Sequence, residues 1–257
     1  MKAIVCVKAV PDTDTRIKIA ADGRSIEKAD VKFIISPYDE YALEEGLKLK
    51  EAAGSGEVVI VSVGGDETPP VLRECLARGA DRAIHIKDSA LDEADTIATG
   101  RALSAAIKGE SPDIVLCGMK GVGGDNSQVA AIIAELLGLP QITDVVKLQI
   151  ADGKVHAERE VEGGHEVVET KLPAVISAQK GLNEPRYPSL KGIMAAKKKP
   201  IDTKSAADLG LSDLAPKVRV IALNYPPTRP AGRIIPGDPD AATQGLVDAL
   251  KNEAKVI

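Results

Sequence analysis

Short apolar runs alternate with helix-length segments through the first half of this chain, and this alternation constrains the fold more than any other feature. The runs are predicted to be strands buried on both faces, because each is continuously apolar rather than alternating with polar residues. Strands separated by helices indicate βαβ units and a doubly wound, mostly parallel sheet in an α/β fold. The predicted strands are residues 3–7, 58–63, 83–86 and 114–117.

The helices between these strands are marked by proline and glycine at their ends. The first begins with Pro37 in its first turn and ends near Gly54. The second ends at Gly79, the third is predicted over residues 92–108, and Gly138 caps the fourth.

Loops at the carboxyl ends of parallel strands form the ligand crevice of a doubly wound fold. In this chain those loops are residues 8–14, 64–66 and 118–125. The topology therefore predicts a binding site at these loops before any motif is considered.

From residue 143 onward the pattern changes to alternating apolar and charged residues, which is typical of antiparallel strands with one exposed face. Asp152-Gly153 and Gly163-Gly164 are hairpin signals. We therefore expect an antiparallel ribbon after the parallel part, followed by one more buried strand. The predicted strands are residues 145–150, 154–161, 165–171 and 174–178.

The C-terminal part of the chain has too little apolar surface to form a core of its own. Residues 218–223 are predicted to be a last short strand, residues 226–239 contain five prolines and are expected to be extended, and residues 241–252 to form an amphipathic helix. The expected organisation is a domain over residues 1–225 and an arm with a helix over residues 226–257. We expect the arm to pack on another surface, either of this chain or of a partner.

Charge and aromatic content exclude one large class of function. The net charge is −5 and aromatic residues make up 2% of the chain. Proteins that bind nucleic acid usually present a basic surface or aromatic stacking platforms. Nucleic acid is therefore not an expected partner.

The cysteines and histidines give no sign of a metal site or a disulfide. Cys6, Cys75 and Cys117 are far apart and form no C-x-x-C pair, and the histidines have no second ligand at metal spacing. No motif singles out a catalytic residue. Reduced cysteines, the lack of a leader-like segment and the lack of a long apolar stretch predict a cytoplasmic protein without membrane insertion.

A glycine-rich loop, residues 118–128, joins the fourth predicted strand to its helix. Its glycines allow close backbone approach, and the following helix N-terminus offers free N–H groups to an anion. We interpret the loop as a cradle for a phosphate or nucleotide. The alternative is a tight turn in which Asn126 or Ser127 caps the helix. The loop matches neither a P-loop nor the G-x-G-x-x-G pattern.

A segment near residue 190 fits neither a strand nor an ordinary helix. Pro185 and Pro188 are expected to hold it extended, with Leu190 on an otherwise polar loop. An exposed leucine flanked by basic residues is typical of a docking surface. The lysine run at residues 197–199 is either a solvated charge run or a patch that steers an acidic partner.

Four runs of sequence carry a family resemblance that covers nearly the whole chain. They are Arg-Glu-Val-Glu-Gly-Gly at residues 159–164, Leu-Pro-Ala-Val at 172–175, Leu-Asn-Glu-Pro-Arg-Tyr at 182–187 and the lysines at 197–199. They resemble the β subunit of the electron-transfer flavoproteins. The resemblance implies an αβ heterodimer with one FAD, held mainly by the α subunit at the interface. It also implies a fold similar to the adenine-nucleotide α-hydrolases, with one structural AMP buried in the β subunit.

The resemblance places AMP in the crevice that the topology predicts, and it implies that Tyr38 approaches the flavin ring. The implied cofactor-binding residues are Cys6, Ser36, Pro37, Tyr38, Asp39, Val63, Gly118, Gly121, Val122, Gly123, Gly124, Asp125, Asn126, Ser127, Gln128 and Val129.

The same resemblance implies that Leu190 inserts into a hydrophobic pocket on acyl-CoA dehydrogenases. The chain would be an electron-carrier subunit rather than an enzyme. It would take electrons from these dehydrogenases and related flavoenzymes and pass them to a membrane quinone oxidoreductase. The implied docking residues are Arg186, Tyr187, Leu190, Met194, Lys197 and Lys198.

One stretch departs from the AMP-binding members of the family, which usually carry several acidic residues and a threonine in the glycine-rich loop. Residues 123–129 and 137–141 look more like the electron-bifurcating members, which hold a second FAD in place of AMP and oxidise NADH. A further alternative is a nucleotide-binding module of the stress-protein type with no flavin partner. The proline-rich arm and the exposed Leu190 argue against that module, because both are expected to be covered by a partner protein.

Overall fold

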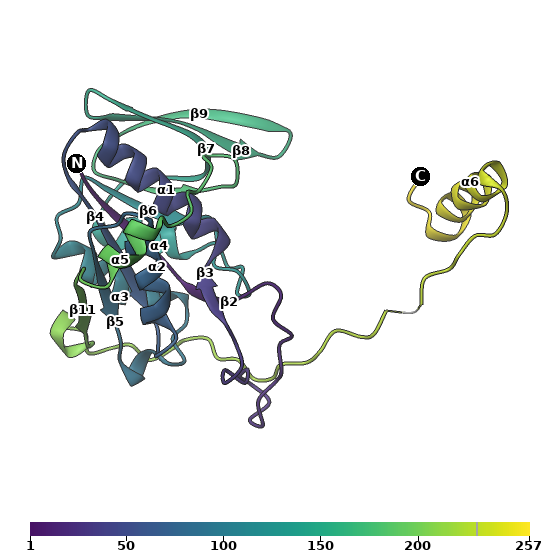
Figure 1. The fold of residues 1–257 in the computed structure, drawn as a ribbon, viewed down its shortest axis with the longest axis horizontal. Helices are drawn as coiled ribbons and strands as arrows, with labels where there is room; N and C mark the ends of the chain where they lie inside the picture. The colour runs from purple at the N-terminus through teal and green to yellow at the C-terminus, as the bar shows by residue number, and fades with distance from the viewer. Residues whose placement is uncertain (230) are drawn as a thin grey trace. The chain divides into compact units, whose positions relative to one another are not determined.

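A nine-stranded sheet forms the centre of the larger unit in the computed structural model, which describes residues 1–229 and 231–257 (Figure 1). The strand order is β11-β5-β4-β1-β6-β10-β7-β8-β9. Strands β11 to β7 run parallel, whereas β7, β8 and β9 form an antiparallel ribbon at one edge. The predicted mostly parallel sheet with an antiparallel ribbon is thus confirmed. The strands are β1 (Lys2–Cys6), β4 (Glu57–Val63), β5 (Arg82–Ile86), β6 (Ile114–Gly118), β7 (Gln141–Ala151), β8 (Lys154–Val161), β9 (Gly164–Lys171), β10 (Ala174–Ala178) and β11 (Ile201–Lys204), with β2 (Ala9–Pro11) and β3 (Phe33–Ile35) as a separate antiparallel pair.

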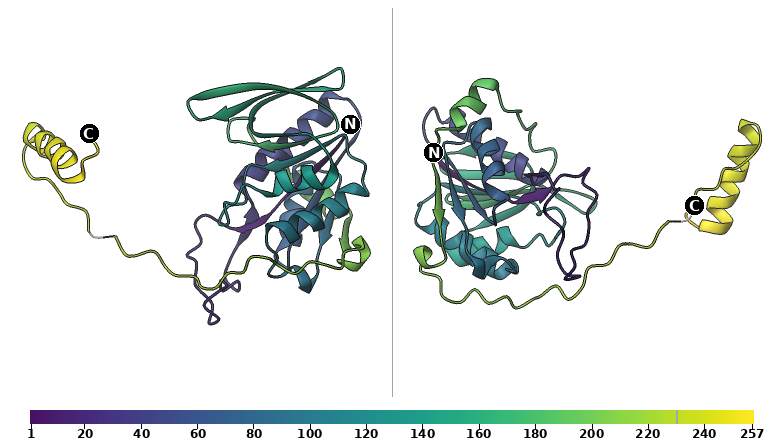
Figure 2. Two further views of the ribbon diagram at one scale, coloured as in Figure 1. Left: turned by 180° about the vertical axis from the view of Figure 1, so that it is seen from behind. Right: turned by 60° about the horizontal axis from the view of Figure 1, so that its bottom comes forward.

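Helices cover both faces of this sheet, as the three views in Figure 1 and Figure 2 show. Successive residues of β1 point to opposite faces. Val5 belongs to the core cluster of Leu43 in α1, and Ile4 to the cluster of Ile107 in α3 and Ile133 in α4. Each fully buried side chain of this size contributes roughly 1.5–3 kcal/mol to folding. The helices are α1 (Pro37–Ala52), α2 (Thr68–Arg78), α3 (Thr96–Lys108), α4 (Val129–Leu137) and α5 (Leu190–Ala196), with 3-10 turns η1 (Ser89–Leu91) and η2 (Ala207–Leu209).

The third helix begins later than the predicted residue 92. Asp95 is its N-cap, and the Asp95 carboxylate accepts a hydrogen bond from the N–H of Ala98 at 2.8 Å. An aspartate in this position satisfies N–H groups that the first helical turn leaves free, so the helix starts at Thr96. The residues before it form the turn η1, which Asp88 caps in the same way.

Neither Asn126 nor Ser127 caps α4, so the cap expected in the tight-turn alternative is wrong. The N-cap position is Gln128, which makes no side-chain cap hydrogen bond. Ser127 has a φ of 52° and lies in the left-handed region, whereas a capping residue typically has β-region backbone.

The last strand predicted at residues 218–223 does not form among the described residues, and the sheet gains β11 at its edge instead. The Asp95 carboxylate accepts hydrogen bonds from the backbone N–H groups of Lys217 and Val218, which ties this stretch to the start of α3. β11 escaped prediction because Ile201 is its one large apolar residue.

The expectation that residues around Leu190 hold an extended, non-helical course is wrong for Leu190–Ala196, which form α5. The prolines restrict only the residues before the helix. Ser189 then caps it, because its hydroxyl accepts a hydrogen bond from the N–H of Gly192 at 3.0 Å.

The second unit comprises Ala222–Ile257. It contains α6 (Pro239–Asp248), which Asp238 caps, and a short π-helical end η3 (Ala249–Ala254). No residue of α6 is buried. Pro230, one of the five prolines of the predicted arm, lies outside the described residues. None of the described helices is long and apolar enough to cross a bilayer.

Candidate functional site

A cavity of about 740 Å³ opens at the carboxyl ends of the parallel strands. Cys6, Val63 and Cys117 line it from the ends of β1, β4 and β6. Each of the loops predicted from topology also contributes to the lining, including Lys8 and Gly64. The volume lies within the range of roughly 300–1,000 Å³ that is typical of small-molecule and cofactor sites.

Asp39, in the first turn of α1, joins two of these loops. Its Oδ2 accepts a hydrogen bond from the N–H of Lys8 at 2.7 Å, and its Oδ1 accepts one from the N–H of Gly118 at 3.0 Å. A Cβ at Gly118 would fall 2.4 Å from Asp39 Oδ1 and 2.7 Å from the carbonyl carbon of Tyr38. Only glycine therefore fits at this position, and α1 fixes the start of the glycine-rich loop.

Burial raises the pKa of Asp39 from 3.8 to about 7, against the smaller opposing effect of the two backbone N–H groups and the Lys8 ammonium. Between these values the folded chain holds a proton that the unfolded chain has released. The free energy of unfolding should therefore fall as pH rises from about 4 to about 7, and level off above that.

We expect Asp39→Asn to remove this part of the pH dependence, which thermal unfolding of the purified complex at a series of pH values would measure. Asp113→Asn is the matched control, because the exposed Asp113 carboxylate also accepts a backbone N–H, that of Lys2. Unfolding curves of Asp39→Asn that shift with pH as much as those of the native protein would contradict the assignment.

The glycine-rich loop folds back on itself beside the cavity. Gly123, Asp125 and Ser127 have left-handed φ values of 91°, 49° and 52°. The N–H of Asp125 donates to the carbonyl of Gly121 at 3.0 Å, and the Lys120 ammonium lies 3.3 Å from the Asp125 carboxylate. The cavity is lined from this loop by Gly118, Met119, Lys120, Gly121, Gly124, Asp125, Asn126, Ser127, Gln128 and Val129.

A cation and a helix end meet at this loop. The Lys8 side chain lies against it, since a Cβ at Gly121 would fall 2.7 Å from Lys8 Cδ and one at Gly124 would fall 3.7 Å from Lys8 Nζ. α4 begins at Val129 without a side-chain cap. Backbone N–H groups at a helix start, next to a lysine, are the arrangement that binds a phosphate.

The remaining predicted residues lie beside the cavity rather than in its lining. Ser36 supports the loop, because its hydroxyl accepts a hydrogen bond from the N–H of Val122 at 3.4 Å. Pro37 opens α1. The Lys120 ammonium lies 5.8 Å from the centre of the Tyr38 ring. Gly123 is also absent from the lining.

The cavity is also lined by two segments that the sequence analysis did not predict. Arg24 comes from the long loop between β2 and β3, and Arg219 follows the stretch that Asp95 ties down. Asp95 itself and Thr96 line the cavity at the start of α3. The sequence could have indicated Asp95 as an N-cap, because aspartate is a common capping residue just before a helix. It gave no sign of the hydrogen bond that Asp95 accepts from the backbone N–H of Lys217.

Residues 182–199, which we call the Leu190 segment, expose apolar side chains. Tyr187, Leu190 and Met194 are 90%, 78% and 59% exposed. Arg186 does not project freely, because it is ion-paired with Glu44 and Glu51 of α1.

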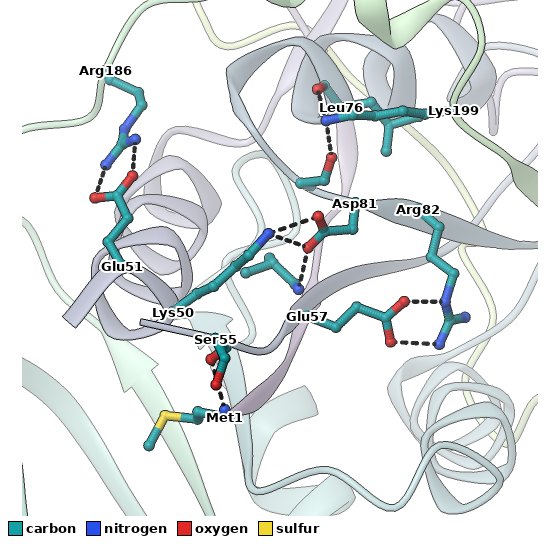
Figure 3. A network of polar contacts seen from close by, with 12 residues as sticks. Met1, Lys50, Glu51, Ser55, Glu57, Leu76, Asp81, Arg82, Arg186 and Lys199 are labelled. Atoms are coloured by element: carbon teal, nitrogen blue, oxygen red, sulfur yellow. Dashed lines mark hydrogen bonds and ion pairs between the residues drawn. The ribbon is translucent and has the colours of Figure 1, made fainter. Parts of the chain in front are cut away.

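The lysine run of this segment divides into two parts. Lys197 and Lys198 are exposed. The Lys199 ammonium instead donates to the carbonyls of Leu76 and Ala80 at the end of α2, and burial lowers its pKa (Figure 3). Only two lysines of this run, Lys197 and Lys198, are thus exposed to solvent.

Comparison with known proteins gives a consistent result. The profile of the electron transfer flavoprotein domain matches residues 24–209. The electron transfer flavoprotein subunit beta of Syntrophomonas wolfei is 43% identical over 257 residues, which cover 100% of this chain and 98% of the relative. That of Bacillus subtilis is 44% identical over 248 residues, covering 95% and 96%. The mitochondrial subunit beta of Arabidopsis thaliana is 37% identical over 259 residues, covering 100% of both chains.

The sheet order and the cavity define a doubly wound α/β protein with a ligand-sized space where this class binds its ligands. The relatives that match along the full length narrow this class of fold to one family. This chain belongs to the electron transfer flavoprotein family as a β subunit, which makes it part of an electron carrier and implies an α-subunit partner.

Proposed function

We propose that this β subunit, paired with its α subunit, accepts electrons from acyl-CoA dehydrogenases and related flavoenzymes and passes them to a membrane quinone oxidoreductase. The observation that carries the proposal is the exposed apolar patch of Tyr187, Leu190 and Met194, next to the exposed Lys197 and Lys198. A large aliphatic side chain that is 78% exposed gains free energy only when a partner covers it.

In this proposal the chain makes and breaks no bonds itself. The α subunit holds most of the FAD, and this subunit completes the flavin pocket, with Tyr38 approaching the ring. The Leu190 segment brings the donor close to the flavin. The second unit, Ala222–Ile257, packs on the α subunit, because its helix α6 buries no residue of its own. The complex works in the cytoplasm.

The cavity at the carboxyl ends of the strands would hold AMP as a structural ligand. Lys8, the turned backbone of the glycine-rich loop and the start of α4 would receive the phosphate. The ends of β1 and β4, with Cys6 and Val63, would form the apolar part of the site.

A second candidate is a bifurcating subunit that holds a second FAD in this cavity and takes electrons from NADH. It is favoured by the loop composition, since Asp125 is the one acidic residue in residues 118–129. We place the simple carrier first, because the Leu190 segment has the sequence of the ordinary carriers.

Nucleotide analysis separates the two candidates. The chain would be produced together with its α subunit, and the purified complex denatured and its nucleotides separated by chromatography. We expect one FAD and one AMP per αβ pair. Two FAD without AMP would replace the simple carrier by the bifurcating protein and make NADH the next ligand to test.

A further inference from the structure

The first half of the Leu190 segment is fastened to α1 by one arginine. The Arg186 guanidinium meets Glu44 with Nε at 2.9 Å from Oε2 and Nη2 at 2.9 Å from Oε1, and its Nη2 also lies 3.1 Å from Glu51 Oε2. The backbone N–H of Arg186 donates to the Glu44 carboxylate at 3.0 Å as well. Figure 3 shows the contact between Arg186 and Glu51. These ion pairs raise the pKa of Arg186 and lower that of Glu51.

A second attachment to α1 lies three residues earlier in the chain, at Asn183. Asn183 Nδ2 donates to the carbonyl of Tyr41 at 3.0 Å and to Glu45 Oε2 at 2.9 Å. Glu44 and Glu45 are only 6% and 4% exposed, although both are carboxylates on a helix surface. The Leu190 segment therefore covers these two side chains, and they in turn set its course.

The second half of the segment is fastened to α2. Arg73 donates to the carbonyls of Ala196 and Lys199. α5 lies so close to α2 that a Cβ at Gly192 would fall 2.2 Å from the carbonyl oxygen of Ala77. Tyr187, Leu190 and Met194 lie between these two attachments and point their apolar side chains to solvent.

We propose that Arg186 is a positioning residue, which holds the apolar patch in its docking geometry before a partner arrives. Ordering a loop on binding costs free energy, and a patch that is already ordered avoids that cost. The proposal rests on the function proposed above, in which the patch binds the electron donor. In this role Arg186 acts through the patch, by holding it in place.

The geometry explains why lysine cannot replace this residue. The planar guanidinium bonds two carboxylates at once, in fixed directions, whereas an ammonium is a single point charge. One of the carboxylates, Glu44, is buried and would lose its matched partner in Arg186→Lys. A simple exposed ion pair would contribute little.

The test compares Arg186→Lys with Arg82→Lys in the αβ complex. Arg82 is a matched control, since its guanidinium on β5 also bridges two glutamates, Glu57 and Glu110, outside the Leu190 segment. Figure 3 shows its contact with Glu57. Steady-state electron transfer from a purified acyl-CoA dehydrogenase with its acyl-CoA substrate would give KM and kcat for the carrier. Reduction of the flavin by dithionite would report the bound cofactor independently of docking.

We expect Arg186→Lys to raise the KM for the carrier by roughly 3- to 10-fold, with kcat, dithionite reduction and nucleotide content unchanged. Arg82→Lys should leave the KM unchanged. In a Leu190→Ala background, Arg186→Lys should add little, because its effect acts through the patch. If Arg186→Lys yields no soluble complex, Glu51→Gln can replace it. This change removes only the exposed ion pair of Arg186 and keeps the buried one with Glu44, and it should also raise the KM.

The outcomes separate this inference from the function on which it rests. An unchanged KM in Arg186→Lys, while Leu190→Ala raises it, overturns the positioning role and leaves the docking function standing. Equal effects of Arg186→Lys and Arg82→Lys, or full additivity with Leu190→Ala, also overturn it. An unchanged KM in Leu190→Ala removes the docking function itself.

Discussion

Replacing Leu190 by alanine is expected to lower kcat/KM for electron transfer from the acyl-CoA dehydrogenase by roughly 10- to 100-fold. Fully burying a leucine side chain is worth about 1.5–3 kcal/mol, and each 1.4 kcal/mol corresponds to about a factor of ten in affinity. Leu190 is 78% exposed in this chain, so almost all of that gain is left for a partner to supply. The measurement is stopped-flow reduction of the carrier flavin by substrate-reduced dehydrogenase over a range of carrier concentrations.

Because Leu190 packs so little against its own chain, the variant should fold, assemble and keep its nucleotides. Val167→Ala is a suitable control, since Val167 is 81% exposed on β9 and lies in the antiparallel ribbon rather than in the Leu190 segment. We expect it to transfer electrons at the native rate. Transfer rates for Leu190→Ala within twofold of the native protein would mean that this leucine does not enter the donor.

The second large effect is expected for Gly118→Ala. The added methyl group would lie 2.4 Å from Asp39 Oδ1 and 2.8 Å from the backbone nitrogen of Asp39, so either α1 or the glycine-rich loop must move. Overpacking of this kind typically costs about 1–3 kcal/mol, and here it also breaks the bond between the Gly118 N–H and the Asp39 carboxylate. The loop that lines the cavity should lose its position.

We therefore expect the Gly118→Ala complex to melt at a lower temperature and to carry less than one equivalent of the nucleotide that we propose for the β-subunit cavity. Thermal unfolding and chromatography of the released nucleotides measure the two effects. Gly164→Ala is the control, because a Cβ at Gly164 would meet nothing within 4 Å and its backbone is not left-handed. Full nucleotide content in Gly118→Ala would show that the cavity does not depend on this contact.

The sequence predicted the strands well where they are continuously apolar, because burial on both faces leaves a simple pattern. β1, β4 and β6 are of this kind. It failed at β11, an edge strand whose pairing with β5 depends on position rather than on composition. The sequence also failed to predict α5. Pro185 and Pro188 indicated an extended segment, although Ser189 after them is a typical N-cap residue.

The candidate site was predicted only as far as local patterns and topology reach. The glycine-rich loop and the strand ends could be found because ligands bind at the carboxyl edge of such sheets. The contacts of Asp95 with Lys217, 122 residues away, and of Arg186 with Glu44, 142 residues away, could not be found this way. They depend on tertiary packing, which leaves no periodic signal in the chain.

Helix α1 carries both Asp39, which faces the cavity, and the carboxylates of Glu44 and Glu51, which hold Arg186. An α-helix turns by about 100° per residue, so inserting or deleting one residue between Asp39 and Glu44 would rotate one group away from its partner while leaving the other in place. The effect of a substitution in α1 can be offset by a second substitution at a contacting position. A change in the length of the helix cannot be offset in this way, because it alters the angle between Asp39 and Glu44. In the evolution of this chain the spacing within α1 should therefore tolerate insertions and deletions far less than the loops around it, whatever residues occupy the positions between.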